Sequence, residues 1–228
     1  MQYLHTYDQW VQDILDGIPI SFSRWGDGEM CAVLGTRVWQ QNCDGHQFFP
    51  RLGQELKAIL LSRPAYRLGL MDLKRMMYAG QSGPKKASLV LNPFLTQNKL
   101  YNYPWYSAEV WHRAFRAGQI HRLVNALNTR KVLLVGPEHL ANIQGLTPFK
   151  HIVIPSKNCY RALESIYQAI VQELKPGDNC LVSLSASMPC NILVDRLFHS
   201  HGQEHSFIDF GAVWDPLAGV LSRKYMRN

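Results

Sequence analysis

The strongest constraint on the fold is a series of four short apolar segments in the second half of the chain. They span residues 131–135, 151–154, 179–184 and 206–210. Helical patterns separate them, most clearly over residues 160–174 and 190–199. Strands that are apolar throughout belong to parallel sheets whose two faces are both covered by helices. We therefore predict an α/β fold, a Rossmann-like domain with a mostly parallel sheet and helices on both faces.

The first half of the chain continues this alternation less regularly. Helices are expected over residues 6–16, 30–34, 48–61, 107–117 and 119–127. Strands are expected over residues 18–22 and 66–70, and a short helix near residues 138–143. No repeat, linker or low-complexity segment divides the chain. Residues 1–228 are therefore expected to form a single domain.

The composition excludes some classes of protein and favours others. Hydrophobic residues make up 46% of the chain, which is enough for a full core and excludes general disorder. The net charge of +7 favours a polyanionic partner such as nucleic acid, a phosphorylated ligand or an anionic membrane surface. No apolar run is long enough to span a membrane and no signal peptide is visible. Together with five cysteines that lack C-x-x-C spacing, this predicts a cytoplasmic protein with reduced thiols.

Residues 24–29, read as a loop after a strand, hold the most informative motif. Asp27 and Glu29 flank Gly28, and two positions apart in an extended segment their side chains would point the same way. Their oxygens suit Mg²⁺ or Mn²⁺, which also bind waters and substrate phosphates. Gly26 and Gly28 allow a tight turn, and Arg24 would contact a phosphate oxygen. The alternative is a solvated G-D-G turn.

A second candidate lies after the strand that ends at residue 184. Ser187 is expected to cap a helix that has Pro189 in its first turn, and Ser185 lies just before it. The free N–H groups of such a helix end bind anions, but the pattern taken alone favours an ordinary capped helix. The chain lacks G-x-G-x-x-G and the Walker A lysine motif, which weighs against dinucleotide oxidoreductases and P-loop NTPases.

Two aspartates near the end of the chain are candidates for proton transfer. Asp209 ends a predicted strand, where ligand sites of α/β proteins gather, and Asp215 follows in a loop. Either could bind a sugar hydroxyl or act as a general base, whereas Asp215 could also be simply an Asp-Pro turn residue. The nine histidines show no convincing ligand spacing and are read as surface residues. Cys190 is interpreted as a packing residue.

A basic and aromatic stretch between residues 74 and 106 is a candidate surface for a polyanion. Its cationic candidates are Lys74, Arg75, Lys85 and Lys86. Aromatic side chains can stack on bases or sugars while lysine and arginine contact phosphates. The alternative is a core-packing segment with a solvated charged rim.

Residues 24–29 (R-W-G-D-G-E) resemble the R-x-G-D-G-E stretch of the GT-D fold glycosyltransferases. In that family the D-x-E carboxylates are associated with a divalent metal and the diphosphate of a nucleotide sugar. Residues 131–136 are similar to the family's V-x-L-V-G-P segment, and residues 209–211 to its late D-x-G element. The resemblance extends over roughly residues 6–215. The turn after residue 184 departs from it by lacking the family's glycines, and the segment after residue 211 by lacking a histidine.

The resemblance implies a metal-dependent glycosyltransferase with a GT-D type fold that moves a sugar from a nucleotide-sugar donor, UDP-sugar first, to a hydroxyl. Asp27 and Glu29 would bind Mn²⁺ or Mg²⁺. The donor would contact residues Arg24, Gly26, Gly28, Ser185 and Ser187. The catalytic candidates are Asp27, Glu29, Asp209 and Asp215.

The acceptor that we expect first is a hydroxymethylated pyrimidine in phage DNA, which would place the enzyme in the host cytoplasm. A cell-surface glycan or a glycoprotein is the alternative acceptor. A non-enzymatic DNA-binding protein and a metal-dependent hydrolase or phosphatase are the alternative classes.

Overall fold

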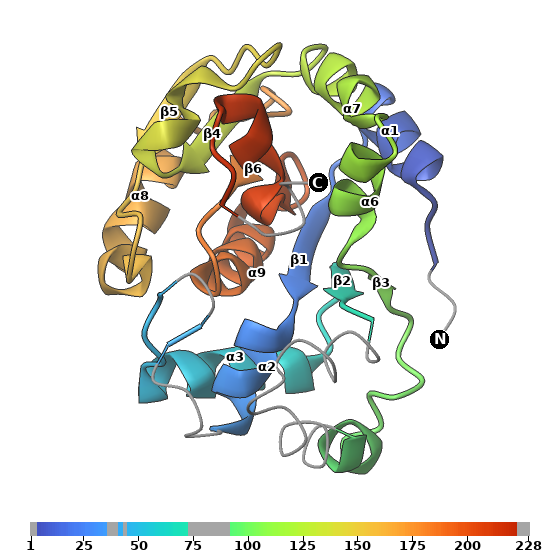
Figure 1. Cartoon of the computed structure of the whole chain (residues 1–228), viewed down its shortest axis with the longest axis vertical. Coiled ribbons are helices and arrows are strands. Elements are labelled where there is room, and N and C mark those ends of the chain that lie inside the picture. The colour runs from blue at the N-terminus through green and yellow to red at the C-terminus, as the bar shows by residue number, and fades with distance from the viewer. Residues whose placement is uncertain (1–3, 36–40, 43–44, 73–91, 223–228) are drawn as a thin grey trace.

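The structure is a computed structural model that describes residues 4–35, 41–42, 45–72 and 92–222 (Figure 1). Its centre is a seven-stranded sheet in the order β3-β2-β1-β7-β6-β4-β5, and every pair of neighbouring strands is parallel. The strands are β1 (Ser21–Trp25), β2 (Arg67–Leu70), β3 (Tyr106–Ser107), β4 (Val132–Gly136), β5 (Lys150–Val153), β6 (Leu181–Leu184) and β7 (Ser206–Asp209). The α/β class and the parallel sheet are therefore confirmed.

Helices connect the strands and cover the sheet. The described α-helices are α1 (Tyr7–Leu15), α2 (Asp27–Leu34), α3 (Pro50–Ser62), α6 (Val110–Arg116), α7 (Ile120–Leu127), α8 (Leu163–Glu173) and α9 (Pro189–His201). The described 3₁₀ helices are η1 (Glu138–Asn142), η2 (Cys159–Ala162) and η3 (Gly211–Ala218). None of the helices in the described part of the chain is long and apolar enough to cross a membrane.

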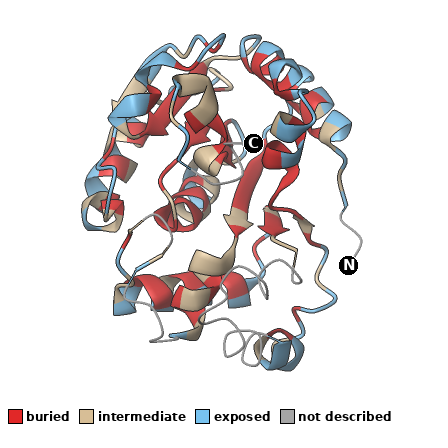
Figure 2. Ribbon diagram, viewed as in Figure 1, coloured by how far each residue is buried: buried red, intermediate tan, exposed pale blue. Residues whose placement is uncertain are grey.

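Successive residues of the strands enter two different cores, one on each face of the sheet. In β4, Leu133 and Val135 pack into the core that contains buried residues of α2, α3, α8 and α9. Val132 and Leu134 pack into the core that contains buried residues of α1, α6 and α7. Figure 2 shows the central strands of the sheet as mostly buried, whereas the edge strand β5 is partly exposed. The apolar run that predicted the sheet is thus explained by burial on both faces.

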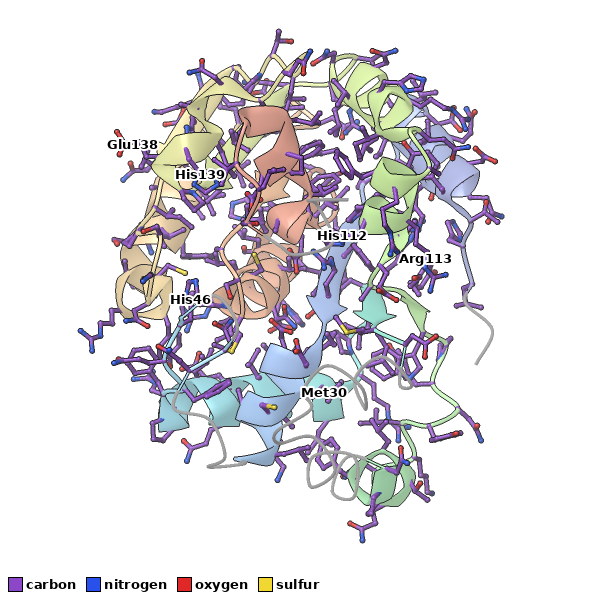
Figure 3. The ribbon with its side chains drawn as sticks, in the orientation of Figure 1. Met30, His46, His112, Arg113, Glu138 and His139 are labelled. Atoms are coloured by element: carbon purple, nitrogen blue, oxygen red, sulfur yellow. The ribbon has the colours of Figure 1, made fainter. Side chains whose placement is uncertain are left out.

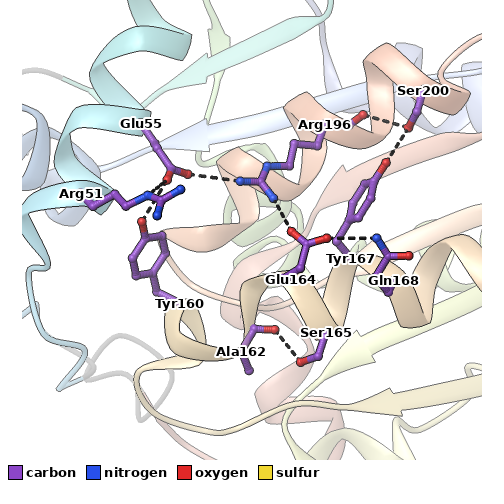
Figure 4. A network of polar contacts seen from close by, with 10 residues as sticks. All are labelled: Arg51, Glu55, Tyr160, Ala162, Glu164, Ser165, Tyr167, Gln168, Arg196 and Ser200. Atoms are coloured by element: carbon purple, nitrogen blue, oxygen red, sulfur yellow. Dashed lines mark hydrogen bonds and ion pairs between the residues drawn. The ribbon is translucent and has the colours of Figure 1, made fainter.

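A polar network ties three helical segments together on the surface (Figure 4). Glu55 of α3 accepts hydrogen bonds from Arg51 Nε at 2.9 Å and Tyr160 Oη at 3.1 Å. Arg196 of α9 lies 3.6 Å from Glu55 Oε2 and 3.0 Å from Glu164 Oε2 of α8. Exposed ion pairs contribute little individually, so the network orients α3, α8 and α9 more than it stabilises them.

Several element boundaries differ from the sequence prediction. The first strand was expected over residues 18–22, but β1 spans Ser21–Trp25, so Arg24 is a strand residue rather than part of a loop. The next helix begins at Asp27 instead of residue 30, because Gly26 is extended and serves as its N-cap. Tyr106–Ser107 is an edge strand, where a helix was expected to begin at residue 107. Residues 138–142 form a 3₁₀ helix, and the helix expected over residues 160–174 divides into η2 and α8.

Candidate functional site

The loops that follow β1 and β7 leave the sheet side by side at a change in strand order. In the sheet, β2 and β3 lie on one side of β1, whereas β7, β6, β4 and β5 lie on the other (Figure 1). Parallel sheets bind ligands outside the carboxyl ends of their strands at such a switch point. The residues that follow β1 and β7 are therefore the first place to look for a site.

Arg24 at the end of β1 faces Asp209 at the end of β7. Arg24 Nε donates a hydrogen bond to the carbonyl oxygen of Ala108 at 2.7 Å. Arg24 Nη1 lies 3.9 Å from Asp209 Oδ1, and the two side chains are 15% and 8% exposed. Burial raises the pKa of Asp209, and the positive charge of Arg24 opposes that shift. The guanidinium is thus held from two sides at the carboxyl end of the sheet.

Asp27 and Glu29 occupy the first turn of α2. The Asp27 carboxylate accepts a hydrogen bond from the amide of Gly28 at 2.9 Å. The Glu29 carboxylate reaches back to the amide of Gly26 at 2.8 Å. The expectation that these side chains share one face of an extended segment is therefore wrong, because they lie on a helix. Each carboxylate instead satisfies a free N–H group at the helix start.

The carboxylates of Asp27, Glu29 and Asp209 are close enough to interact electrostatically. Burial raises the pKa of Glu29 to about 7, hydrogen bonds from its own amide and that of Gly26 oppose the rise, and the charges of Asp27 and Asp209 add to it. Like charges disfavour one another's ionised form. A cation bound here would favour the ionised forms of these carboxylates.

The chemistry of this acidic group fits a hard divalent cation. A carboxylate offers about four lone-pair sites, so Asp27 and Glu29 can bind a metal while they accept their backbone hydrogen bonds. Mg²⁺ keeps several water ligands and takes one or two protein carboxylates together with substrate phosphates. Within the described residues, no group of three or more His, Cys, Asp or Glu side chains is arranged as a metal site. A two-carboxylate site for Mg²⁺ or Mn²⁺ at Asp27 and Glu29 stays a prediction.

Ser185 and Ser187 lie between β6 and α9. Ser185 Oγ donates to the carbonyl oxygen of Gly211 at 2.7 Å, which joins this loop to the one after β7. Ser187 Oγ accepts from Asn42 Nδ2 at 3.0 Å. The prediction that Ser187 caps α9 is wrong, because Met188 holds the N-cap position and Ser187 has a φ of 53°. Its hydroxyl instead contacts the segment at residues 41–42.

A pocket of about 370 Å³ opens at the carboxyl ends of β4, β6 and β7. Its walls are formed by residues His46, Pro137, His139, Leu140, Ile154, Pro155, Ser156, Cys159, Ser185, Ala186, Ser187, Gly211, Ala212, Asp215 and Ser222. Gly211 also contacts Arg24, so the pocket adjoins the Arg24–Asp209 pair. Of the predicted residues, Ser185, Ser187 and Asp215 line this pocket, whereas Arg24, Asp27, Glu29 and Asp209 do not.

His139 is the residue of the pocket that sequence reasoning missed. His139 Nε2 lies 3.0 Å from Asp215 Oδ1, and Ser222 Oγ donates to Asp215 Oδ2. Asp215 was expected in a loop but belongs to the 3₁₀ helix η3. His139 was read as a surface histidine, yet it lines the pocket together with His46, and both are labelled in Figure 3. Its position three residues after the end of the apolar strand β4 was the only signal.

Other candidates fall outside this arrangement. Lys74, Arg75, Lys85 and Lys86 lie outside the described residues. Within the same basic and aromatic stretch, Trp105 is fully buried and Tyr101 is half exposed, so part of the stretch belongs to the core. Burial raises the pKa of the Cys190 thiol well above its ordinary value, which fits a packing role.

Comparisons with known proteins support the fold. No protein-family model matches the sequence, and no curated protein is similar to it in sequence. Among solved structures, the chain is similar to a glycosyltransferase with the domain of unknown function 1792 from Streptococcus sanguinis, with a TM-score of 0.68 and 22% identity over 98% of this chain and 87% of that chain. A second structure of the domain of unknown function 1792, described as a distinct glycosyltransferase fold, has a TM-score of 0.63 and 16% identity over 93% of this chain and 79% of that chain. This chain therefore has the same fold as those proteins.

Proposed function

We propose that this protein is a glycosyltransferase that moves a sugar from a nucleotide-sugar donor to a hydroxyl acceptor. The observation that carries the proposal is the meeting of Arg24, Asp27, Glu29 and Asp209 at the carboxyl ends of the adjacent strands β1 and β7. These groups suit a diphosphate and a divalent cation. The shared fold with the glycosyltransferases of the domain of unknown function 1792 supports the same reaction class.

Arg24 is the group that would bind the donor's diphosphate. Its Nε donates to Ala108 O and its Nη1 faces Asp209, so the guanidinium is oriented before any ligand arrives. Donors that are fixed in advance stabilise the charge of a leaving group without reorganising during the reaction. Asp209 is 5% exposed and packed against Arg24, which makes it a positioning residue rather than a general base.

Asp27 and Glu29 would hold the Mg²⁺ or Mn²⁺ ion. When bound, such an ion neutralises the negative charge that develops on the departing nucleoside diphosphate. The amides of Gly26 and Gly28 donate to the two carboxylates and thereby restrict their orientation. A UDP-sugar is the donor to test first.

The acceptor is a hydroxyl of a glycan, a glycoprotein or a hydroxymethylated pyrimidine in DNA. The charge of +7 is the observation that favours DNA. Phosphate contacts release counterions, so a DNA acceptor would bind more weakly as salt rises, on the order of a thousandfold between 50 and 200 mM for six contacts. A glycan acceptor would show a flat response. Salt-sensitive DNA binding by a protein that transfers no sugar would instead indicate the DNA-binding class.

The test is sugar transfer from labelled UDP-sugars to these acceptors in the presence of Mn²⁺. Asp27→Asn should abolish transfer while leaving the fold intact, because asparagine keeps the hydrogen bond to Gly28 and loses the charge. Asp8→Asn, which changes an exposed first-turn aspartate of α1, is the matched control and should transfer at the wild-type rate. Equal activity of the two variants would overturn the assignment of Asp27. Release of free sugar without transfer to any acceptor would indicate a hydrolase.

A further inference from the structure

The pocket beside the Arg24–Asp209 pair contains a histidine whose ring is held by a carboxylate. His139 Nε2 lies 3.0 Å from Asp215 Oδ1, and the two residues belong to η1 and η3, which follow β4 and β7. We propose that His139 accepts the proton of the acceptor hydroxyl and that Asp215 orients it. This inference rests on the proposed function, since it names the proton acceptor for the same transfer.

Asp215 is arranged to support a neighbouring base rather than to act as one. Both of its carboxylate oxygens are engaged, Oδ1 by His139 and Oδ2 by the hydroxyl of Ser222. Its side chain is 9% exposed, whereas that of His139 is 34% exposed. A carboxylate acceptor at Nε2 selects the tautomer that carries its proton there, which leaves Nδ1 as the proton-accepting nitrogen. The geometry is that of a base oriented by a third group.

The surroundings of His139 favour this role. The pocket of about 370 Å³ is within the size range of small-molecule sites. Among the described residues, the titratable groups that line the pocket with His139 are Asp215 from η3, His46 and Cys159. Glu138 precedes His139 in η1 and does not line the pocket. Burial raises the pKa of Cys159 to about 12, so that thiol stays neutral. The carboxylate of Asp215 therefore faces the imidazolium that forms when His139 accepts a proton.

Gly211 connects the pocket to the proposed donor site. It lines the pocket, its carbonyl oxygen accepts from Ser185 Oγ at 2.7 Å, and its Cα lies against the guanidinium of Arg24. The hydroxyl of an acceptor in the pocket would thus lie next to His139. The donor's diphosphate would lie on the other side of Gly211, at Arg24. In the same displacement, Arg24 would contact the leaving diphosphate and His139 would contact the attacking hydroxyl.

The step balances as a proton transfer coupled to displacement. The acceptor's O–H bond breaks and its proton moves to His139 Nδ1. The acceptor oxygen forms a bond to the anomeric carbon of the sugar. The bond between that carbon and the donor's phosphate oxygen breaks, and its electron pair leaves with the nucleoside diphosphate. The imidazolium afterwards releases its proton to solvent.

His139→Ala tests the inference, with transfer, donor binding and imidazole rescue measured together. General-base catalysis contributes about 10²–10⁴-fold, so kcat should fall by that factor, while stabilisation by UDP stays at the wild-type level. Added imidazole should restore part of the rate, because it can occupy the space left in the pocket. His199→Ala, at an exposed position of α9, should behave as wild type.

Two outcomes would overturn the inference while the proposed function stands. One is a His139→Ala variant that keeps the wild-type rate, and the other is a variant that loses UDP binding. Asp215→Asn is a second variant with an independent expectation: a reduced kcat with unchanged UDP binding, and no rescue by imidazole. A wild-type protein that neither binds a nucleotide nor transfers sugar would instead show that the proposed function fails.

Discussion

Gly211, just beyond β7, lies directly against the guanidinium of Arg24 at the end of β1. Its φ is +58°, and a Cβ at this position would stand 2.0 Å from Arg24 Nη1. A glycine is therefore required both by the left-handed backbone and by the close approach of the arginine. The contact fixes the loop that carries the pocket wall relative to the group that we assign to the diphosphate.

Gly211→Ala should displace Arg24 and lower sugar transfer. A left-handed alanine costs about 1–2 kcal/mol, and the clash with Nη1 adds to that cost. Misplacing a group by about 1 Å can lower the rate on the order of 10²-fold. Chemical denaturation and transfer kinetics measure the two effects.

Gly219→Ala is the matched control for that substitution. Its φ is +77°, and a Cβ there would meet nothing within 4 Å. It should show the cost of the left-handed backbone alone and keep the wild-type rate. A Gly211→Ala variant that is no less active than Gly219→Ala would contradict the role assigned to Arg24.

Arg24→Lys should weaken donor binding although it keeps the positive charge. Lysine lacks the planar fork that bonds Ala108 O while presenting further N–H groups to a phosphate. A loss of about 1.5–3 kcal/mol for a hydrogen bond to a charged group corresponds to roughly a 10–100-fold rise in the dissociation constant. Calorimetric titration with UDP measures this dissociation constant. Arg116→Lys, on the exposed end of α6, serves as control, and equal affinities for the two variants would exclude a specific role for Arg24.

The stability of the fold should fall as the pH is lowered below about 6.5, the ordinary pKa of histidine. His205 is 2% exposed, its Nδ1 accepts from the amide of Cys180 at 3.1 Å, and burial lowers its pKa. Between the lowered pKa and the ordinary one the unfolded chain binds more protons than the native protein, so stability is lost on acidification. Below the lowered pKa, His205 is protonated in both the native and the unfolded state, and this loss of stability is complete.

His205→Asn should remove that part of the pH dependence, because the asparagine oxygen can still accept from Cys180 and does not titrate. Urea denaturation between pH 5 and 7.5 measures the change in slope. His199→Asn changes a histidine that is 64% exposed and should leave the slope unaltered. If the free energy of unfolding depends on pH with the same slope in the wild type and in His205→Asn, another group dominates the acid sensitivity.

The sheet was predictable from the sequence because its central strands are buried on both faces. Residues 132–136 are buried throughout, so every one of these positions requires an apolar or small residue. The resulting apolar run is visible in the sequence. The start of α2 was not predictable in the same way. Gly26 and Gly28 are typical of turns, and only the position of Glu29, three residues after Gly26, indicated a capped helix. The sequence singled out the carboxylates of Asp27 and Glu29, whose role stays a prediction, but it did not predict that they lie on a helix.

The remaining parts of the site depend on contacts between distant residues. Ser187 has the residue type of an N-cap, but its left-handed φ and its bond to Asn42 come from the packing of the loops. His139 and Asp215 are 76 positions apart and meet because β4 and β7 both flank β6. No local pattern encodes that pairing, so the sequence alone indicated Asp215 and passed over His139.

The most direct test of the central claim is a thermal-unfolding measurement with UDP and Mn²⁺, on the wild type and Asp27→Asn. Ligand at one hundred times its dissociation constant adds about 2.7 kcal/mol of stability, which corresponds to about 5–10 °C for a chain of this length. We expect such a rise in the wild type, its loss with a chelator and its absence in Asp27→Asn. No rise with UDP or with the other nucleoside diphosphates tested beside it, or an equal rise in the variant, would contradict a donor site built on Arg24, Asp27 and Glu29.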